Sequence, residues 1–314
     1  MTASSLTERS APAAGDDTRQ GPSLTKAMAV RCVRTIVEGQ RNHGISIFAP
    51  VDHAGNPVGP GFVRKLTSNA AEVAFAIAMV SHAAEHGAPW PYPTVFQALR
   101  KGKMGEIFME YVPSVCDRKR LRDVANAGPM ADAIIASSRL IEDIATQAQL
   151  DLPDRRASGG GTEQAVLAQG LDTAVDVPQL QAMEQAFDAL PTAHCHNDVG
   201  YTNMGFTDAG LRPVIRFIDF GSVGRNVLGA ELHHFASFSF RTATEQALFA
   251  ALVQELAERA GLERRAVRFA AYHYAMRRAL QRELRLCRLA KKPVADLRHV
   301  AQLHARAASA FSKL

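Results

Sequence analysis

The first third of the chain alternates apolar and polar residues in short runs. Segments 34–39 and 45–52 are rich in β-branched residues, and FVRKL at 62–66 follows a turn of Gly, Asn and Pro. Three such runs within about thirty residues predict an antiparallel meander of strands. Two further strands are expected in 95–112, around the tight turn KGKMGE. Segment 24–33 is interpreted as a short helix.

Apolar residues recur at helical spacing from 68 to 87 and through most of the chain beyond Pro113. Ser68 or Asn69 can cap the first of these helices, and Gly87 can end it. The same spacing predicts five more helices, in segments 120–150, 177–190, 242–260, 263–290 and 295–311.

These elements predict an α+β fold of two lobes, and 314 residues are enough to build both. The N-terminal lobe, 23–112, is expected to be a small five-stranded antiparallel sheet with one helix after its third strand. The C-terminal lobe, 113–314, is expected to be larger and mainly helical, with a hairpin-like insertion within 194–221. Residues 1–22 lack an apolar run, which predicts a disordered tail rather than a secretory signal.

The overall composition narrows the class of protein. Apolar residues make up 47% of the chain and charged residues 21%, as in ordinary soluble globular proteins. No apolar run approaches the roughly 18 to 20 residues that a membrane-spanning helix requires, so no membrane partner is expected. The four cysteines are scattered and form no CxxC pair, which favours a reducing, cytoplasmic location.

Carboxylate and amide side chains are concentrated in HCHNDVGYTNMGF at 194–206 and in FIDFGSVG at 217–224. Phosphoryl transfer requires metal ions and positive charge on the phosphates, and a carboxylate that orients the attacking hydroxyl. An aspartate is ionised at neutral pH, so we expect Asp198 to accept the hydrogen bond of that hydroxyl and to be the catalytic carboxylate. Asn203 and Asp219 offer the hard oxygen ligands that Mg²⁺ prefers.

The motif HNDVGYTN followed by IDFG resembles the catalytic loop and metal-binding motif of the aminoglycoside phosphotransferase and choline kinase group, relatives of the protein kinases. The resemblance extends over residues 30–240 and implies a bilobal protein-kinase-like fold. It also implies that Lys65 is the phosphate-binding lysine of the third strand, with Glu72 as its partner at the start of the following helix. IFMEYVP resembles the connector that binds adenine through its backbone, which nominates Met109, Glu110 and Val112.

Three positions depart from the pattern of the family. Asn197 stands where the family usually has Gly or Arg, and Glu231 in GAELHHFA stands where it tends to have Asp, which we interpret as a scaffold position. The turn from Gly39 to Gly44, expected to cover the phosphates, has only two glycines. None of these departures removes a group that the chemistry needs.

The resemblance implies an enzyme that transfers the γ-phosphate of ATP, with GTP as an alternative donor, to a hydroxyl of a small molecule in the presence of Mg²⁺. In this family the C-terminal helices, here within 242–314, wall the acceptor pocket. From residue 263 to the C-terminus there are 13 Arg and Lys against 3 acidic residues. This charge disfavours a polycationic aminoglycoside, although Glu142, Asp143 or Glu231 could contribute locally, and favours a neutral or anionic sugar-, nucleoside- or macrolide-like acceptor.

Other functions are compatible with parts of the sequence. A protein kinase would need an activation segment, but only about ten residues separate Gly221 from GAELHHF. A nucleotide-binding pseudoenzyme or interaction protein would not require Lys65, Asp198, Asn203 and Asp219 together. The basic C-terminal helices carry no nucleic-acid motif, so they are interpreted as a solvated face with Arg on the outside. The oligomeric state is left open.

Individual site residues also have alternative interpretations. Asp198, Asn203 and Asp219 could be turn caps, because Asx residues commonly close turns. Arg64 is the alternative to Lys65, and points to the other face of its strand. A zinc site is the alternative for the histidines, whereas Cys195 is expected to be a packed core thiol. The histidines concerned are His194, His196, His233 and His234.

Overall fold

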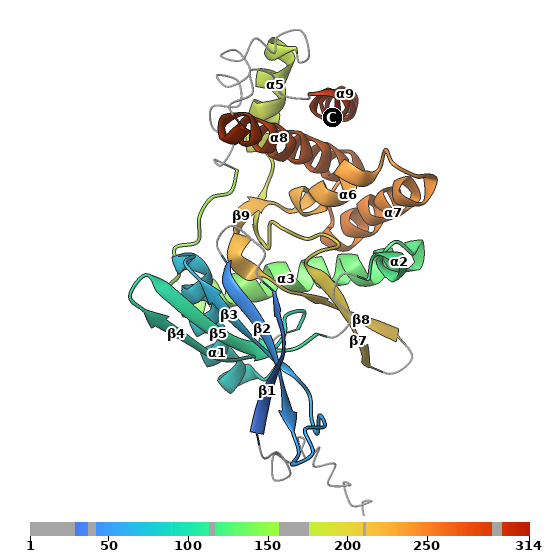
Figure 1. Ribbon diagram of the computed structural model, residues 1–314. Coiled ribbons are helices and arrows are strands. Elements are labelled where there is room, and N and C mark those ends of the chain that lie inside the picture. The colour runs from blue at the N-terminus through green and yellow to red at the C-terminus, as the bar shows by residue number, and fades with distance from the viewer. Residues whose placement is uncertain are drawn as a thin grey trace, which may run out of the picture.

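The computed structural model describes residues 29–36, 42–88, 90–112, 117–156, 176–209, 212–290 and 297–314. A sheet with one helix lies at one end of the molecule and a group of helices at the other, with α3 (Ala127–Gln147) between them (Figure 1). The predicted two-lobed α+β fold is confirmed. The tail predicted at 1–22 and residues 39–41 of the Gly39–Gly44 turn lie outside the described residues. The lobe boundary at 112 borders residues 113–116, which also lie outside them, and it stays a prediction.

The N-terminal lobe contains the predicted five-stranded antiparallel sheet, with strand order β1-β2-β3-β5-β4. Helix α1 (Ala70–His86) follows the third strand, as predicted. The Asn69 side chain caps it by accepting a hydrogen bond from the Glu72 N–H, and Gly87, with φ of 84°, ends it. The strands are β1 (Ala29–Ile36), β2 (Asn42–Val51), β3 (Phe62–Thr67), β4 (Val95–Lys101) and β5 (Met104–Glu110).

The helix predicted for 24–33 is wrong over the part that the structure describes. Residues from Ala29 onward belong to β1, in which Ala29 pairs with Val51 and Cys32 with Phe48 across β2. The short run of Ala, Val and Cys is compatible with either state, and the free edge of β2 decides it by offering a partner for hydrogen bonding.

Helix α1 packs very close to β5. A Cβ atom on Gly105 would lie only 2.0 Å from Cγ2 of Val73, so no residue other than glycine fits at this position without displacement of the helix. Val73 is the neighbour of Glu72 in the first turn of α1. The close approach therefore holds the start of α1, and the Glu72 carboxylate with it, against the sheet.

The helices predicted for the C-terminal lobe are confirmed, with small shifts of their ends. The first begins at Ala127 rather than at residue 120, because Asp117 and Asp123 cap two short helices that precede it. These are α2 (Arg118–Leu121) and the 3-10 helix η2 (Val124–Asn126); the others are α5 (Val177–Asp188), α6 (His233–Phe238), α7 (Ala243–Ala260), α8 (Arg264–Ala290) and α9 (Arg298–Phe311), with α6 not predicted.

Two small antiparallel strand pairs interrupt these helices. β7 (Met204–Ala209) and β8 (Arg212–Phe217) form the predicted hairpin, whereas β6 (Thr192–Cys195) and β9 (Gly224–Val227) pair across a longer interval. The loop after β6 meets the loop after β8 because the Ile218 N–H donates to the Asn203 carbonyl at 2.9 Å. The two polar motifs of the sequence are thereby brought side by side.

A buried aromatic cluster joins the two lobes behind these loops. The ring of Tyr92 stacks on His196 with 5.7 Å between centroids, and contacts Phe220 at 6.1 Å and Phe75 of α1 at 6.4 Å. All four side chains are 1% exposed or less. Aromatic contacts of this kind stabilise beyond the area they bury, so they fix the two loops against α1.

Two predictions made from composition can be compared with the structure. No helix within the described ranges is long and apolar enough to span a membrane. Cys195 is 1% exposed, and burial raises the pKa of its thiol well above the usual value. It is therefore a packed core thiol, as predicted, and is not a nucleophile.

Candidate active site

Lys65 of β3 and Glu72 of α1 form a buried ion pair. Lys65 Nζ lies 2.5 Å from Glu72 Oε1, and both residues are 3% exposed or less. The Thr67 hydroxyl donates to the second carboxylate oxygen of Glu72 at 2.9 Å. Burial by itself would lower the pKa of Lys65, but the charges of Glu72 and Asp219 outweigh it and raise that pKa, so the ammonium is retained.

Asp219 reaches the same ammonium from the loop after β8. Its Oδ1 lies 2.7 Å from Lys65 Nζ, yet its side chain is 37% exposed, so the carboxylate is also open to a ligand. The backbone of Asp219 has φ of 62°, a left-handed conformation that Asp and Asn tolerate better than most residues. Asn69 Nδ2 donates to the Gly221 carbonyl at 2.7 Å, which ties this loop to the start of α1.

Asp198 lies in the loop after β6, where His196 and Asn203 hold it. The Asp198 N–H donates to His196 Nδ1 at 3.3 Å, and His196 Nε2 donates to the Ile218 carbonyl at 3.1 Å. Burial lowers the pKa of His196, so its neutral ring bridges the two loops as a scaffold. Asn203 Nδ2 donates to Asp198 Oδ2 at 2.7 Å and to the Asp198 carbonyl at 3.0 Å.

Glu231 holds the backbone of this loop in place. Its two carboxylate oxygens accept hydrogen bonds from the backbone N–H groups of His196 and Asn197. Complete burial raises the pKa of Glu231 to about 8, although these N–H donors act in the opposite direction. Asn197 has φ of 65° and donates to the Cys195 and Gly224 carbonyls, so both departures from the family pattern are accommodated as scaffold contacts.

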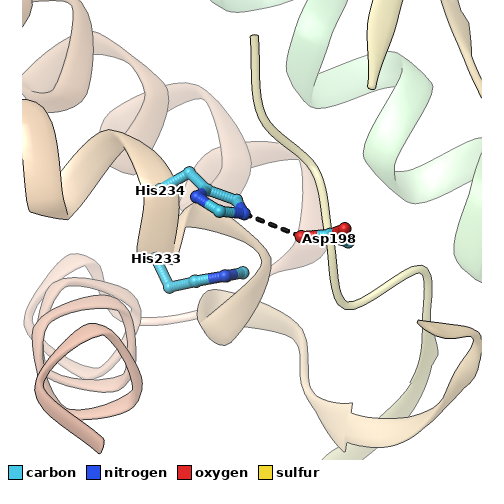
Figure 2. A group of neighbouring side chains, drawn as sticks. All are labelled: Asp198, His233 and His234. Carbon is cyan, nitrogen blue, oxygen red and sulfur yellow. Dashed lines mark hydrogen bonds and ion pairs between the residues drawn. The ribbon is translucent and has the colours of Figure 1, made fainter. Parts of the chain in front are cut away.

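His234 of α6 contacts Asp198 directly (Figure 2). Its Nε2 donates to Asp198 Oδ1 at 2.8 Å. Burial would raise the pKa of Asp198, but the hydrogen bond from His234 helps to lower it well below the usual value. A Cβ atom on Gly200 would lie 2.8 Å from His234 Cδ2, so the absence of a side chain at Gly200 leaves room for the imidazole.

The four histidines of the zinc alternative do not assemble into one site. Instead, Asp198, His233 and His234 form a group of neighbouring side chains (Figure 2), and their ligand atoms lie within 4.8 Å of one another. His233 Nδ1 bonds the Ala230 carbonyl at 3.0 Å, and burial holds its pKa well below the usual value. A metal ion here would displace the hydrogen bond that His234 donates to Asp198, so the direct contact explains the cluster without an ion.

The donor set around Asp219 fits a hard cation. Asn203 lies beside Asp219 through the backbone bond to Ile218, and its amide nitrogen is already committed to Asp198. Its amide oxygen and the half-exposed carboxylate of Asp219 are therefore the atoms that remain for a metal. Carboxylate and amide oxygens are the ligands that Mg²⁺ prefers.

Arg64, the alternative to Lys65, faces the opposite side of β3 and pairs with Glu106.

The connector residues lie at and just beyond the end of β5, where Met109 and Val112 are buried. The Glu110 N–H donates to the Thr94 carbonyl at 2.9 Å, which commits this donor to the protein. Its carboxylate also accepts from the Thr94 N–H at 3.1 Å.

A cavity of about 680 Å³ opens beside His234, between α6, α8 and α9. Its wall includes Phe238 and Phe240 together with four arginines, whereas Glu142, Asp143 and Glu231 do not line it. The predicted solvated face of α8 is thus partly a cavity wall. The prediction that arginines lie outside is also wrong for Arg277, which is 3% exposed. The arginines of the wall are Arg241, Arg278, Arg282 and Arg285.

Sequence reasoning missed several residues of this site. The sequence suggests only a zinc-ligand role for His234, because its contact with Asp198 spans 36 positions and no local pattern marks it. Asn69 was predicted only as a helix cap, and the cap position did not reveal its bond to Gly221. The spacing of the α8 arginines was visible in the sequence, but the cavity depends on how α6, α8 and α9 pack.

Known structures share this fold across nearly the whole chain. A GDP complex of an aminoglycoside 2'-phosphotransferase-IIIa mutant aligns over 91% of this chain and 92% of its own, with a TM-score of 0.59 and 11% identity. The aminoglycoside phosphotransferase APH(4)-Ia, in a ternary complex with ADP and hygromycin B, covers 92% and 96% with a TM-score of 0.53 and 14% identity. A macrolide 2'-phosphotransferase from Brachybacterium faecium aligns over 87% of this chain and 91% of its own, with a TM-score of 0.55 and 13% identity.

No protein-family model and no curated protein sequence matches the chain. The sequence resemblance and the structural likeness nevertheless lead to the same group of proteins. The chain therefore has the bilobal, protein-kinase-like fold of the aminoglycoside and macrolide phosphotransferases.

Proposed function

We propose that this protein is a small-molecule kinase that transfers the γ-phosphoryl group of ATP, or of GTP, to a hydroxyl group. The observation that carries this proposal is the convergence of Lys65, Glu72 and Asp219 into one ion-paired cluster. The Asn203–Ile218 backbone bond sets Asp198 and Asn203 beside that cluster. Turn caps would not require a buried lysine between two carboxylates.

The charged groups have complementary roles in this reaction. Lys65 binds an oxygen of the nucleotide phosphates, and Glu72 holds its ammonium in place. Asp198 stays ionised because its pKa is lowered, so it orients the acceptor hydroxyl by accepting its hydrogen bond. The acceptor oxygen forms a bond to the γ-phosphorus as the bond to the leaving ADP oxygen breaks. The hydroxyl proton then passes to Asp198 and on to solvent.

Asn203 and Asp219 are the residues that would hold Mg²⁺, which neutralises phosphate charge during transfer. Lys65 complements this by shielding one oxygen of Asp219 while leaving the other available. Nucleotide recognition falls to the connector, in which Met109 and Val112 provide apolar side chains and backbone groups for a purine. Because the Glu110 N–H is committed to Thr94, its contribution to the base is limited to its carbonyl.

The structural relatives support a nucleotide-dependent reaction. One was solved with GDP and another with ADP and hygromycin B, so this fold accommodates a nucleotide and, in the second structure, a small molecule as well. The segment after Asp219 supports a small acceptor as well. η4 (Phe220–Ser222), β9 and the 3-10 helix η5 (Leu228–Leu232) follow one another almost without a gap, which leaves no length for an activation segment.

The test is transfer from radiolabelled ATP, with Mg²⁺, to a library of hydroxyl compounds and, separately, to a protein extract. We expect label on small molecules in the wild-type protein and none in Asp198→Asn. Label confined to polypeptides would favour a protein kinase. Bound ATP without any transfer would favour a nucleotide-binding pseudoenzyme. Activity that requires Zn²⁺ and is lost in His233→Ala would point to the histidine cluster instead.

A further inference from the structure

We propose that the acceptor carries an anionic group, a phosphate or a carboxylate, which the arginines of the cavity beside His234 bind. This inference rests on the proposed function, in which Asp198 orients the acceptor hydroxyl. His234 links the two, because it lines the cavity and donates to Asp198. A compound seated in the cavity therefore lies next to the carboxylate that activates its hydroxyl.

The arginines of α8 line the cavity because of their helical spacing. Arg278, Arg282 and Arg285 stand at positions i, i+4 and i+7, which places them along one face of the helix. Arg241, beyond the end of α6, adds a fourth guanidinium to the wall. Among the described residues that line the cavity, Glu283 is the one carboxylate.

Two of these guanidinium groups, those of Arg278 and Arg282, are available to a ligand. Within the described part of the chain, neither Arg278 nor Arg282 forms an ion pair with a carboxylate. Arg241 instead lies over the ring of Phe238, 4.3 Å from its centroid. Guanidinium remains charged at any physiological pH, and its planar set of donors matches the two oxygens of a phosphate or carboxylate.

The charge of the wall excludes one acceptor class as clearly as it favours another. A polycationic aminoglycoside would be repelled by the guanidinium groups of Arg241, Arg278 and Arg282, against which the described lining sets one carboxylate, that of Glu283. An anionic compound would be attracted, and its entry would relieve the mutual repulsion of the arginines. The positive charge of the cavity therefore favours a negatively charged acceptor.

The remainder of the wall describes the carbon skeleton of the acceptor. Phe238 and Phe240 provide apolar surface, and His299 packs edge-on against Phe240 with 6.2 Å between ring centroids. The cavity volume of about 680 Å³ falls within the range for ligands of drug size. A phosphorylated or carboxylated sugar or ring alcohol, larger than a triose, fits this combination of apolar surface and cationic groups.

The first experiment measures binding to the full-length protein while a non-hydrolysable ATP analogue and Mg²⁺ fill the nucleotide site. Calorimetric titrations compare glucose 6-phosphate and gluconate with glucose and glucosamine. We expect the anionic probes to bind and the neutral and cationic probes not to bind, and the stronger of the two anions identifies the group. If neither anion binds, or if glucosamine binds as well as they do, the proposal is overturned.

Matched variants locate the binding. Arg282→Gln and Arg278→Gln should each weaken the affinity for the anionic probe by about 10- to 100-fold, the value of a lost charged hydrogen bond. Arg268→Gln is the control, because Arg268 is an exposed residue of α8 that lies about 21 Å along the helix from Arg282 and does not line this cavity. An equal loss in Arg268→Gln would indicate general attraction to a basic helix and would refute the assigned site.

The two proposals can fail separately. If the wild-type protein shows no Mg²⁺-dependent ATP binding, the proposed kinase function is contradicted, while the titrations of the cavity still test the anion site. Conversely, transfer to neutral or cationic acceptors, unaffected by Arg282→Gln, would leave the kinase function intact and refute an anionic acceptor. Arg282→Glu should shift acceptor preference toward glucosamine relative to glucose 6-phosphate, with the KM for ATP unchanged.

Discussion

His234 Nε2 lies 2.8 Å from Asp198 Oδ1, so the proposed catalytic carboxylate has one oxygen bound by an imidazole and the other by the amide of Asn203. Two donors from different parts of the chain thus fix the plane of the carboxylate before any ligand enters, and Figure 2 shows the one from His234. Preorganisation of this kind places the hydrogen-bond acceptor for an incoming hydroxyl at no further entropic cost.

Removal of this imidazole should slow turnover without weakening nucleotide binding. We expect His234→Phe to lower kcat by about 10- to 100-fold, as is typical for the loss of a group that orients a catalytic side chain. His234→Gln retains an N–H donor and should recover much of the rate. Steady-state kinetics with ATP as the varied substrate provide the measurement, and a rise in KM for ATP at constant kcat would contradict the role.

Asp198→Asn should abolish transfer while leaving ATP affinity nearly unchanged. The amide cannot accept the hydroxyl proton, so the expected loss in kcat is about 100-fold to 10,000-fold. Asp143→Asn, an exposed change on α3, is the control for general effects of charge removal. Wild-type turnover in Asp198→Asn, measured with radiolabelled ATP, would show that another group orients the acceptor.

Asp219→Asn should remove the contribution of Mg²⁺ to nucleotide binding. Asn tolerates the left-handed backbone at this position, so the change removes a charge without adding backbone strain. We expect ATP affinity in the presence of Mg²⁺ to fall by about 10- to 100-fold. Titrations with and without Mg²⁺ test this; a variant that keeps the full Mg²⁺ effect would exclude Asp219 as a ligand.

The Lys65–Glu72 pair should be strongly coupled in stability. Lys65→Met leaves the Glu72 carboxylate buried without its partner and should cost about 3 to 5 kcal/mol in the free energy of unfolding. The double variant Lys65→Met/Glu72→Gln should regain part of that loss, because no uncompensated charge remains. Urea unfolding of the wild type, both single variants and the double variant measures the coupling, and simple additivity would argue against a direct pair.

Stability should depend on pH through Glu231. Its pKa of about 8 in the folded protein exceeds the usual 4.5, so the folded state retains the proton longer than the unfolded state does. The stabilising contribution of Glu231 to the free energy of unfolding is complete below about pH 4.5. It declines by about 1.4 kcal/mol per pH unit as the pH rises toward 8. The neighbouring Asp198 carboxylate raises this pKa further, whereas the hydrogen bond with Cys195 lowers it.

Urea unfolding of the wild type and of Glu231→Gln at several pH values between 5 and 8 measures this dependence. As the pH rises, the free energy of unfolding of the wild type should fall relative to that of Glu231→Gln. A difference that stays constant over this range would mean that Glu231 does not take up a proton on folding.

The parts of the structure that the sequence predicted are those governed by local patterns. The strands around Lys65, the cap at Asn69 and the long helices follow from periodicity and capping, and their chain order suggested the Lys65–Glu72 pair. The helix predicted over segment 29–33 is wrong because the state of this segment depends on pairing with β2, whose partner residues lie outside the segment itself.

The parts that escaped prediction depend on tertiary packing. The contact between His234 and Asp198 requires α6 to approach the loop after β6, and nothing in the sequence near either residue encodes that approach. Likewise, exposed and cavity-lining arginines have the same spacing on α8, so only the positions of α6 and α9 distinguish Arg282 from Arg268.

The cavity arginines and the proposed phosphate-binding residues lie on different elements, which has a consequence for how new substrate specificities arise. Three of the cavity arginines, Arg278, Arg282 and Arg285, are exposed residues of α8, whereas Lys65 and Glu72 are buried. Substitutions of these arginines can redirect the protein to a differently charged compound without disturbing the phosphate-handling groups. A short stretch of one helix is thus a natural starting point for laboratory evolution toward new acceptors.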